Sequence, residues 1–94
     1  MLGDVEHHRD AILRIAAHHG ARNVRLFGSA ARGDHRPESD VDLLVEMESD
    51  RSLLDLVGLG QDLEELLHRR VDVLTDESLH PALRHRIASE ARTL

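Results

Sequence analysis

Residues 28–46 read GSAARGDHRPESDVDLLVE, and this stretch decides both the fold and the chemistry that the chain can support. Gly28 and Ser29 are followed by ten residues and then by Asp40-Val41-Asp42. A glycine-serine turn lets a phosphate approach the backbone closely, and two neighbouring carboxylates favour a divalent cation. The order of these parts predicts a site for a nucleoside triphosphate bound together with a metal.

The second half of this stretch has the pattern of a β-strand. In residues 40–46 apolar side chains alternate with Asp40 and Asp42, in the period of two that is typical of a strand. The two carboxylates are therefore expected on one face, about 6.5 to 7 Å apart along the chain. Side chains so placed can share one ion or bind two ions about 3.5 to 4 Å apart. Their oxygen ligands favour Mg²⁺ or Mn²⁺ over zinc.

The first half of the stretch predicts a phosphate-binding turn. Residues 23–27 form a strand that runs straight into Gly28, which has no Cβ to hold a phosphate oxygen away from the backbone. Ser29 adds a hydroxyl and can open a short helix whose unpaired N–H groups face the same oxygen. Arg32 follows, and its planar guanidinium can bind two phosphate oxygens at once.

A third carboxylate is needed if an acceptor hydroxyl is to lose its proton while two metals bind the triphosphate. Asp72 is the candidate, in the apolar strand predicted for residues 70–75 (RVDVLT). A charge in such a strand costs several kcal/mol unless something pairs with it. A shared metal would supply that pairing, and without metal the three carboxylates should repel one another.

This set of residues resembles the nucleotidyltransferase superfamily of DNA polymerase β, whose pattern is G-S, about ten residues, D-x-D and a later strand with a third acid. The segments LFGSAARG, SDVDLLVE and RRVDVLT are most similar to the minimal nucleotidyltransferases, and the resemblance covers about residues 22 to 76. These are single small domains without added helical or substrate domains. The resemblance implies a nucleotidyltransferase fold and an enzyme that moves a nucleoside monophosphate, usually AMP from ATP, to a hydroxyl.

The resemblance also implies a partner and a role for each site residue. Minimal nucleotidyltransferases often pair with a HEPN-type ribonuclease toxin, for which they are the antitoxin, and the acceptor is then most plausibly a tyrosine of that toxin. Two Mg²⁺ (or Mn²⁺) ions are expected on Asp40, Asp42 and Asp72. The β- and γ-phosphates are expected on Gly28, Ser29 and Arg32.

Two other functions stay open at this point. The chain could be an antitoxin that neutralises its toxin by contact alone, although a pure binding protein has no reason to place three carboxylates together. It could also be the nucleotidyltransferase subunit of a two-chain enzyme that acts on a small molecule, and the sequence does not argue against this. The preferred nucleotide and the stoichiometry of the complex are not determined by the sequence.

The composition excludes several other kinds of site. Phe27 is the only residue among Phe, Tyr and Trp, so bases cannot stack on an aromatic platform. There is no cysteine, which excludes disulfides, thiolate zinc sites and cysteine nucleophiles. The 12 basic residues are all arginine, so no lysine nucleophile exists. With 18 acidic residues and a net charge of −6, direct binding to nucleic acid is not expected.

Periodicity predicts a single domain over residues 1–94, an α/β fold of the α+β type with a small mixed β-sheet of about three strands. Helices are expected at residues 5–19, at residues 52–68 and from His80-Pro81 onward. A chain of 94 residues has little room for a separate acceptor-binding domain, so we expect a partner to present the acceptor. No signal peptide or membrane-spanning run is visible, so a cytoplasmic protein is expected.

The predicted helix at residues 52–68 has more apolar surface than one sheet needs. Its leucine and valine side chains cover an arc of about 240°, whereas a helix on one sheet face needs little more than about 100°. Leu59 and Leu66 are expected on an interface with a second chain, as a hetero-oligomer or a homodimer. Gly58 and Gly60 suggest that another backbone packs closely there. The alternatives are a helix more deeply buried in its own domain, or one broken at the glycines.

Overall fold

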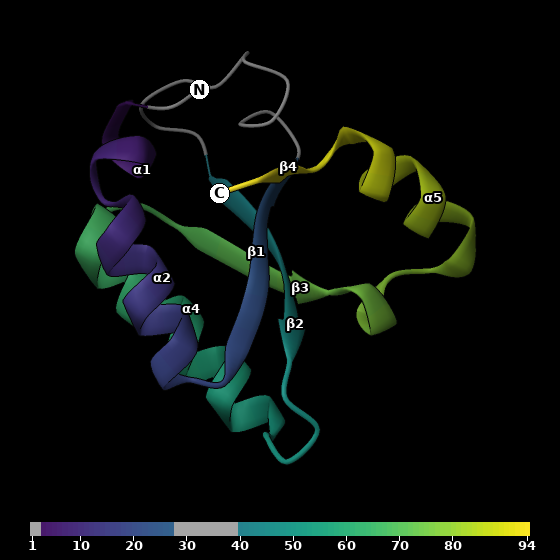
Figure 1. Cartoon of the computed structure of the whole chain (residues 1–94), viewed down its shortest axis with the longest axis horizontal. Coiled ribbons are helices and arrows are strands. Elements are labelled where there is room, and N and C mark those ends of the chain that lie inside the picture. Colours follow the sequence, from purple (N-terminus) through teal and green to yellow (C-terminus); the bar gives the residue numbers. More distant parts are fainter. Residues whose placement is uncertain (1–2, 28–39) are drawn as a thin grey trace.

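The computed structural model describes residues 3–27 and 40–94, and its chain alternates between helices and strands (Figure 1). Two helices, α1 (Gly3–His7) and α2 (Arg9–His18), precede the strands β1 (Ala21–Phe27) and β2 (Val41–Met47). Helix α4 (Leu53–Leu67) leads to strand β3 (Val71–Thr75) and a short 3₁₀ turn, η1 (Asp76–Ser78). Helix α5 (Pro81–Glu90) and strand β4 (Arg92–Thr93) follow.

The strands form one mixed sheet in the order β3-β2-β1-β4. Strand β1 is antiparallel to both β2 and β4, whereas β2 and β3 are parallel. The predicted fold class is therefore confirmed, with one strand more than the expected three. The added strand, β4, has two residues, Arg92 and Thr93, opposite Leu26 and Arg25. A two-residue strand is too short to show a period in sequence, which is why periodicity missed it.

Helices α2 and α4 pack on one face of the sheet and on each other, as Figure 1 shows. Alternate residues of β2 point to this face, and Val41, Leu43 and Val45 are all at most 1% exposed. They meet Ile12 from α2 and Leu63 from α4 in a single apolar cluster. In Figure 1 helix α5 lies on the other side of the sheet, and none of its residues is buried.

The predicted helix boundaries agree with the structure except at the N-terminus. The helix expected at residues 5–19 is two helices, separated at His8. Helix α4 starts after Ser52, whose backbone N–H donates to the Asp55 carboxylate at 3.0 Å. That bond, together with the Arg51 charge, lowers the pKa of Asp55. The ionised Asp55 carboxylate therefore stabilises the folded protein, and this stabilisation is lost as the pH falls through the lowered pKa.

Within the described ranges, every helix is too short or too polar to cross a lipid bilayer.

Helix α4 buries a different face from the one expected. Leu59 is fully buried in the chain's own core, so its assignment to an interface was wrong. Leu66 is partly buried against the same core. A Cβ built at Gly58 would lie 3.1 Å from the His19 ring, and one at Gly60 would lie 3.7 Å from Val73. The close neighbours of both glycines therefore belong to this chain.

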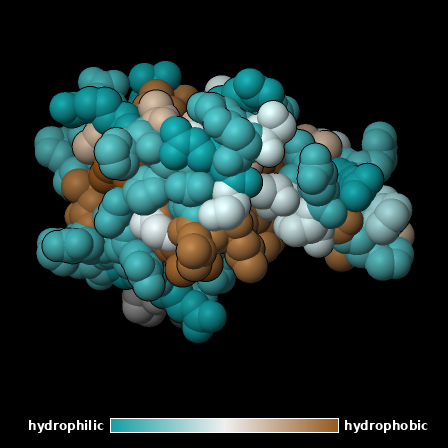
Figure 2. Space-filling model, turned by 90° about the horizontal axis from the view of Figure 1, so that it is seen from below, coloured by the Kyte–Doolittle hydropathy of each residue, from teal (hydrophilic) through white to brown (hydrophobic). Residues whose placement is uncertain are grey.

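The apolar surplus of α4 lies instead at its N-terminal end. Leu53 is 73% exposed, Leu54 is 81% exposed and Val57 is 49% exposed. Figure 2 looks at the molecule from the side where α4 begins, and it shows an apolar patch among hydrophilic side chains. Three large apolar residues within five positions of one helix are more than the scattered exposed residues of an ordinary surface.

We predict that Leu59→Ala lowers the free energy of unfolding by about 2 to 5 kcal/mol, because it leaves a cavity in the core. Leu54→Ala is the matched control on the same helix, and it should change the free energy by no more than about 0.5 kcal/mol. Urea denaturation measures both values. Equal effects of the two substitutions would show that α4 packs through a different face.

Candidate active site

The parallel pairing of β2 and β3 brings two of the predicted carboxylates side by side. Asp42 and Asp72 are direct partners in the register, on neighbouring strands about 4.8 Å apart. Their sequence neighbours Val41 and Val71 are buried on the helix-covered face. Because side chains alternate along a strand, both carboxylates lie on the opposite face. The sheet therefore places Asp42 and Asp72 together, as the sequence predicted.

The third carboxylate, Asp40, lies just before β2, and Arg70 contacts both Asp40 and Asp72. Arg70 Nε lies 3.6 Å from Asp72 Oδ1 and 3.9 Å from Asp40 Oδ2. The side chains of Asp40 and Asp72 are 48% and 43% exposed. One guanidinium thus contacts two of the three carboxylates at an accessible edge of the sheet.

Arg70 is a residue of the site that no motif in the sequence indicated. It precedes Asp72 by two positions, so a strand places both side chains on the same face, and this spacing was the available signal. Its position opposite Asp40 depends on the register of two strands, which periodicity does not give. The positive charge offsets part of the repulsion expected among the carboxylates.

The predicted phosphate-binding residues lie outside the described residues. These are Gly28, Ser29 and Arg32. Strand β1 ends at Phe27, which is the direct partner of Asp42 in the antiparallel register. The chain therefore leaves β1 beside the carboxylates. The roles assigned to these three residues stay predictions.

The donor set fits a hard divalent cation by its chemistry. Asp40, Asp42 and Asp72 offer only carboxylate oxygens, on one face and partly accessible to solvent. Within residues 3–27 and 40–94, no three histidine, aspartate or glutamate side chains converge closely enough to hold a metal ion as they stand. Since Arg70 contacts two of the carboxylates, we expect its guanidinium to leave when a cation binds there.

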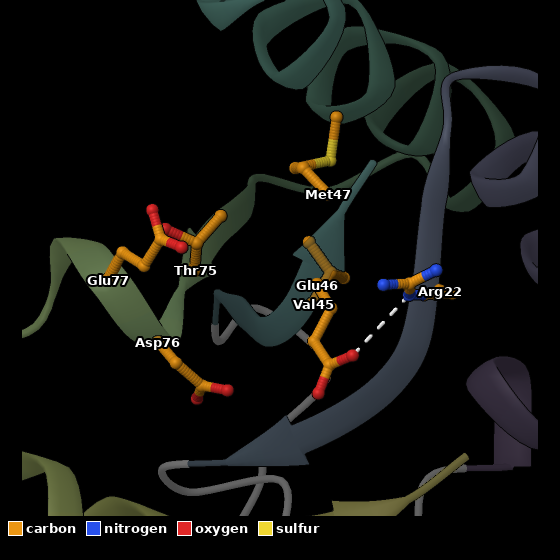
Figure 3. A pocket seen from close by; sticks show the side chains of 7 residues that line it. All are labelled: Arg22, Val45, Glu46, Met47, Thr75, Asp76 and Glu77. Atoms are coloured by element: carbon orange, nitrogen blue, oxygen red, sulfur yellow. Dashed lines mark ion pairs between the residues drawn. The ribbon is translucent and has the colours of Figure 1, made fainter. Parts of the chain in front are cut away.

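A separate pocket of about 280 Å³ opens at the other end of β2 and β3 (Figure 3). Glu46 is paired with Arg22 at 3.5 Å, and Asp76 is paired with Arg25 at 3.2 Å. The pocket begins at Val45, three residues beyond Asp42 and about 10 Å along the strand. Two of its three acidic groups, Glu46 and Asp76, already have cationic partners, and Asp40, Asp42 and Asp72 do not line it, so it is not the predicted metal site. It is lined by Arg22, Val45, Glu46, Met47, Thr75, Asp76 and Glu77.

Comparison with known proteins agrees with this geometry. Residues 8–94 match the family described as nucleotidyltransferase domain. A Methanocaldococcus jannaschii protein assigned as a protein adenylyltransferase is 49% identical over 80 residues, which covers 85% of this chain and 86% of the relative. A solved structure described as a minimal nucleotidyltransferase has a TM-score of 0.87 at 47% identity, over 96% of this chain and 92% of that one.

The fold also occurs in a toxin–antitoxin complex. The structure of a tri-AMPylated Shewanella oneidensis HEPN toxin with its MNT antitoxin has a TM-score of 0.71 to this chain, over 94% of this chain and 69% of that one. The sequence identity is 18%, so this likeness shows a shared fold.

We predict that Arg70→Gln destabilises the metal-free protein at low ionic strength by up to about 1 kcal/mol, because two carboxylates lose their counter-ion. The difference should vanish at about 1 M salt. Mg²⁺ should raise the melting temperature of this variant more than that of the wild type, since the ion no longer displaces an arginine. Thermal denaturation with EDTA and with Mg²⁺ measures both effects.

Arg86→Gln is the matched control. The Arg86 side chain is 74% exposed, against 71% for Arg70, and it contacts Glu90 at 3.5 Å. This ion pair is far from the site in sequence. If the two variants respond to salt and Mg²⁺ in the same way, Arg70 has no special relation to the carboxylates.

Proposed function

The chain belongs to the nucleotidyltransferase domain family, and we propose that it is a protein adenylyltransferase that moves AMP from ATP to a hydroxyl of a HEPN-type toxin. In this proposal the chain is the antitoxin and the acceptor is a tyrosine. The Methanocaldococcus jannaschii relative supports the adenylyltransferase activity, and the AMPylated HEPN toxin bound to a protein of the same fold supports the kind of partner.

The observation that carries the proposal is the register of Asp42 with Asp72 beside Asp40. Three carboxylates on one accessible sheet face repel one another, so their grouping is unfavourable unless a cation binds them. A divalent ion with a nucleoside triphosphate is the ligand that this set fits best. The chain leaves β1 beside this group at Phe27, directly before the Gly28-Ser29 pair.

In the proposed mechanism, Asp40, Asp42 and Asp72 would hold magnesium beside the triphosphate, and Gly28, Ser29 and Arg32 would hold the β- and γ-phosphates. Bound magnesium would neutralise phosphate charge and make the acceptor hydroxyl more acidic. Asp72 orients this hydroxyl and accepts its proton.

The bonding changes are those of one in-line displacement. The acceptor oxygen forms a bond to the α-phosphorus while the bond from that phosphorus to the bridging oxygen breaks. AMP then remains on the acceptor and pyrophosphate leaves. Most of the rate gain comes from positioning and from stabilising negative charge on the phosphates.

Two alternatives make different predictions about the carboxylates. An antitoxin that acts by contact alone would neutralise its toxin equally well when Asp42 is replaced by asparagine. A subunit that modifies a small molecule would need the same carboxylates but would leave the mass of a protein partner unchanged. The partial exposure of Asp40 and Asp72 favours a site that is open to a large acceptor.

We expect ATP and Mg²⁺ to add one or more AMP units to a co-purified HEPN-type partner, measured by intact mass. Asp42→Asn should slow this transfer by at least about a hundredfold, because it removes a ligand of the magnesium that would stabilise the phosphate charge. Glu46→Gln is the control on the same face of β2, and it should transfer AMP at close to the wild-type rate. Transfer by Asp42→Asn at the wild-type rate would contradict the proposal.

A further inference from the structure

A groove of about 350 Å³ lies between α4 and β3 and reaches Asp72. Its apolar wall includes Leu53 and Val57, which are 73% and 49% exposed. The groove is thus continuous with both the exposed apolar patch of α4 and the candidate active site. It is lined by Leu53, Leu56, Val57, Gly60, Gln61, Glu64, Val71, Asp72 and Val73.

The floor of the groove is an edge of the sheet, because β3 is the last strand in the order that residues 3–27 and 40–94 form. The Arg70 C=O accepts a hydrogen bond from Val41 N–H of β2 at 2.9 Å, so the backbone groups of Arg70 face the sheet. The next amide, Val71 N–H, points outward and donates to the Glu64 carboxylate at 3.1 Å. By the same alternation Val73 N–H and C=O also point outward.

No hydrogen bond to the Val73 backbone occurs within residues 3–27 and 40–94. Outward N–H and C=O groups on an edge strand are the groups that an added strand would pair with. The Val73 side chain packs near Gly60 on the helix side, whereas Asp72 lies on the opposite face. An extended segment paired at Val73 would therefore present alternate side chains to the groove and to Asp72.

The charge around the groove selects the kind of segment that binds. The charged residues among the described ones that line the groove are Glu64 and Asp72, and both are acidic. The net charge of the whole chain, −6, has the same sign. A segment with apolar side chains and at least one basic residue is complementary to both the patch and the charge.

We propose that the groove between α4 and β3 binds an extended segment of the acceptor protein, which adds to this edge of the sheet at Val73. The residue with the target hydroxyl lies on the Asp72 face, and the residues directly before and after it are apolar and enter the groove. This inference rests on the proposed function, since it identifies how the partner reaches the same site.

The test compares two neighbouring leucines of α4. Leu53 lines the groove, whereas Leu54, which is 81% exposed, is not among the described residues that line it. Leu53→Asp should weaken binding of the co-purified HEPN-type partner at least about tenfold, because it places a charge in an apolar contact. Leu54→Asp adds the same charge in the same helical turn and should change the dissociation constant by less than about twofold.

Two further readouts separate docking from folding and from chemistry. The melting temperature of Leu53→Asp, and its shift with Mg²⁺ and AMP-PNP, should equal those of the wild type. In the wild-type complex, hydrogen exchange at the Val73 amide should slow, as expected for an amide that pairs with an added strand. Val57→Asp, also in the groove, should reproduce the effect of Leu53→Asp.

The inference is wrong if Leu53→Asp and Leu54→Asp bind the partner equally well, or if the Val73 amide exchanges at the same rate in the complex. It is also wrong if sedimentation shows that the wild type self-associates through the groove and that only this self-association is lost in Leu53→Asp. Weakened binding by Leu53→Asp without any AMP transfer by the wild type would support the groove and overturn the proposed function instead.

Discussion

The parallel pairing of β2 with β3 determines where the carboxylates, helix α4 and the groove lie. Parallel neighbours cannot be joined by a tight turn, so the chain must cross from one end of the sheet to the other, and α4 is that crossover. The register that results sets Asp42 beside Asp72. The same pairing leaves β3 at the edge of the sheet with α4 above it, so one topological choice produces both the candidate active site and the groove that leads to it.

The electrostatics of the site follow from that geometry. Grouped carboxylates on an accessible sheet face are unfavourable, and Arg70 is the nearby cation that reduces this cost in the described structure. Because its contacts are long and solvent-exposed, Arg70 can leave at little cost when a stronger cation binds. In the absence of metal, the carboxylates of the site are thus only weakly paired, and their oxygens are the ligands that magnesium prefers.

The sequence was sufficient for the elements and the family, and insufficient for what depends on register or burial. Alternation predicted the strands that carry Asp42 and Asp72, because this signal is local. The short strand β4 and the place of Arg70 beside Asp40 depend on pairing between distant segments. The buried face of α4 was also missed, since a helix that is apolar over a wide arc does not reveal which leucines face the sheet.

Anomalous scattering from Mn²⁺, in crystals grown with a non-hydrolysable ATP analogue, would locate the metal relative to the three carboxylates. Manganese should be bound to carboxylate oxygens of Asp40, Asp42 and Asp72, in contact with the triphosphate, and the Arg70 guanidinium should have moved away from Asp72. Manganese bound elsewhere, with Arg70 still between the carboxylates and the nucleotide, would contradict the central claim that the register of β2 and β3 builds the nucleotidyl-transfer site.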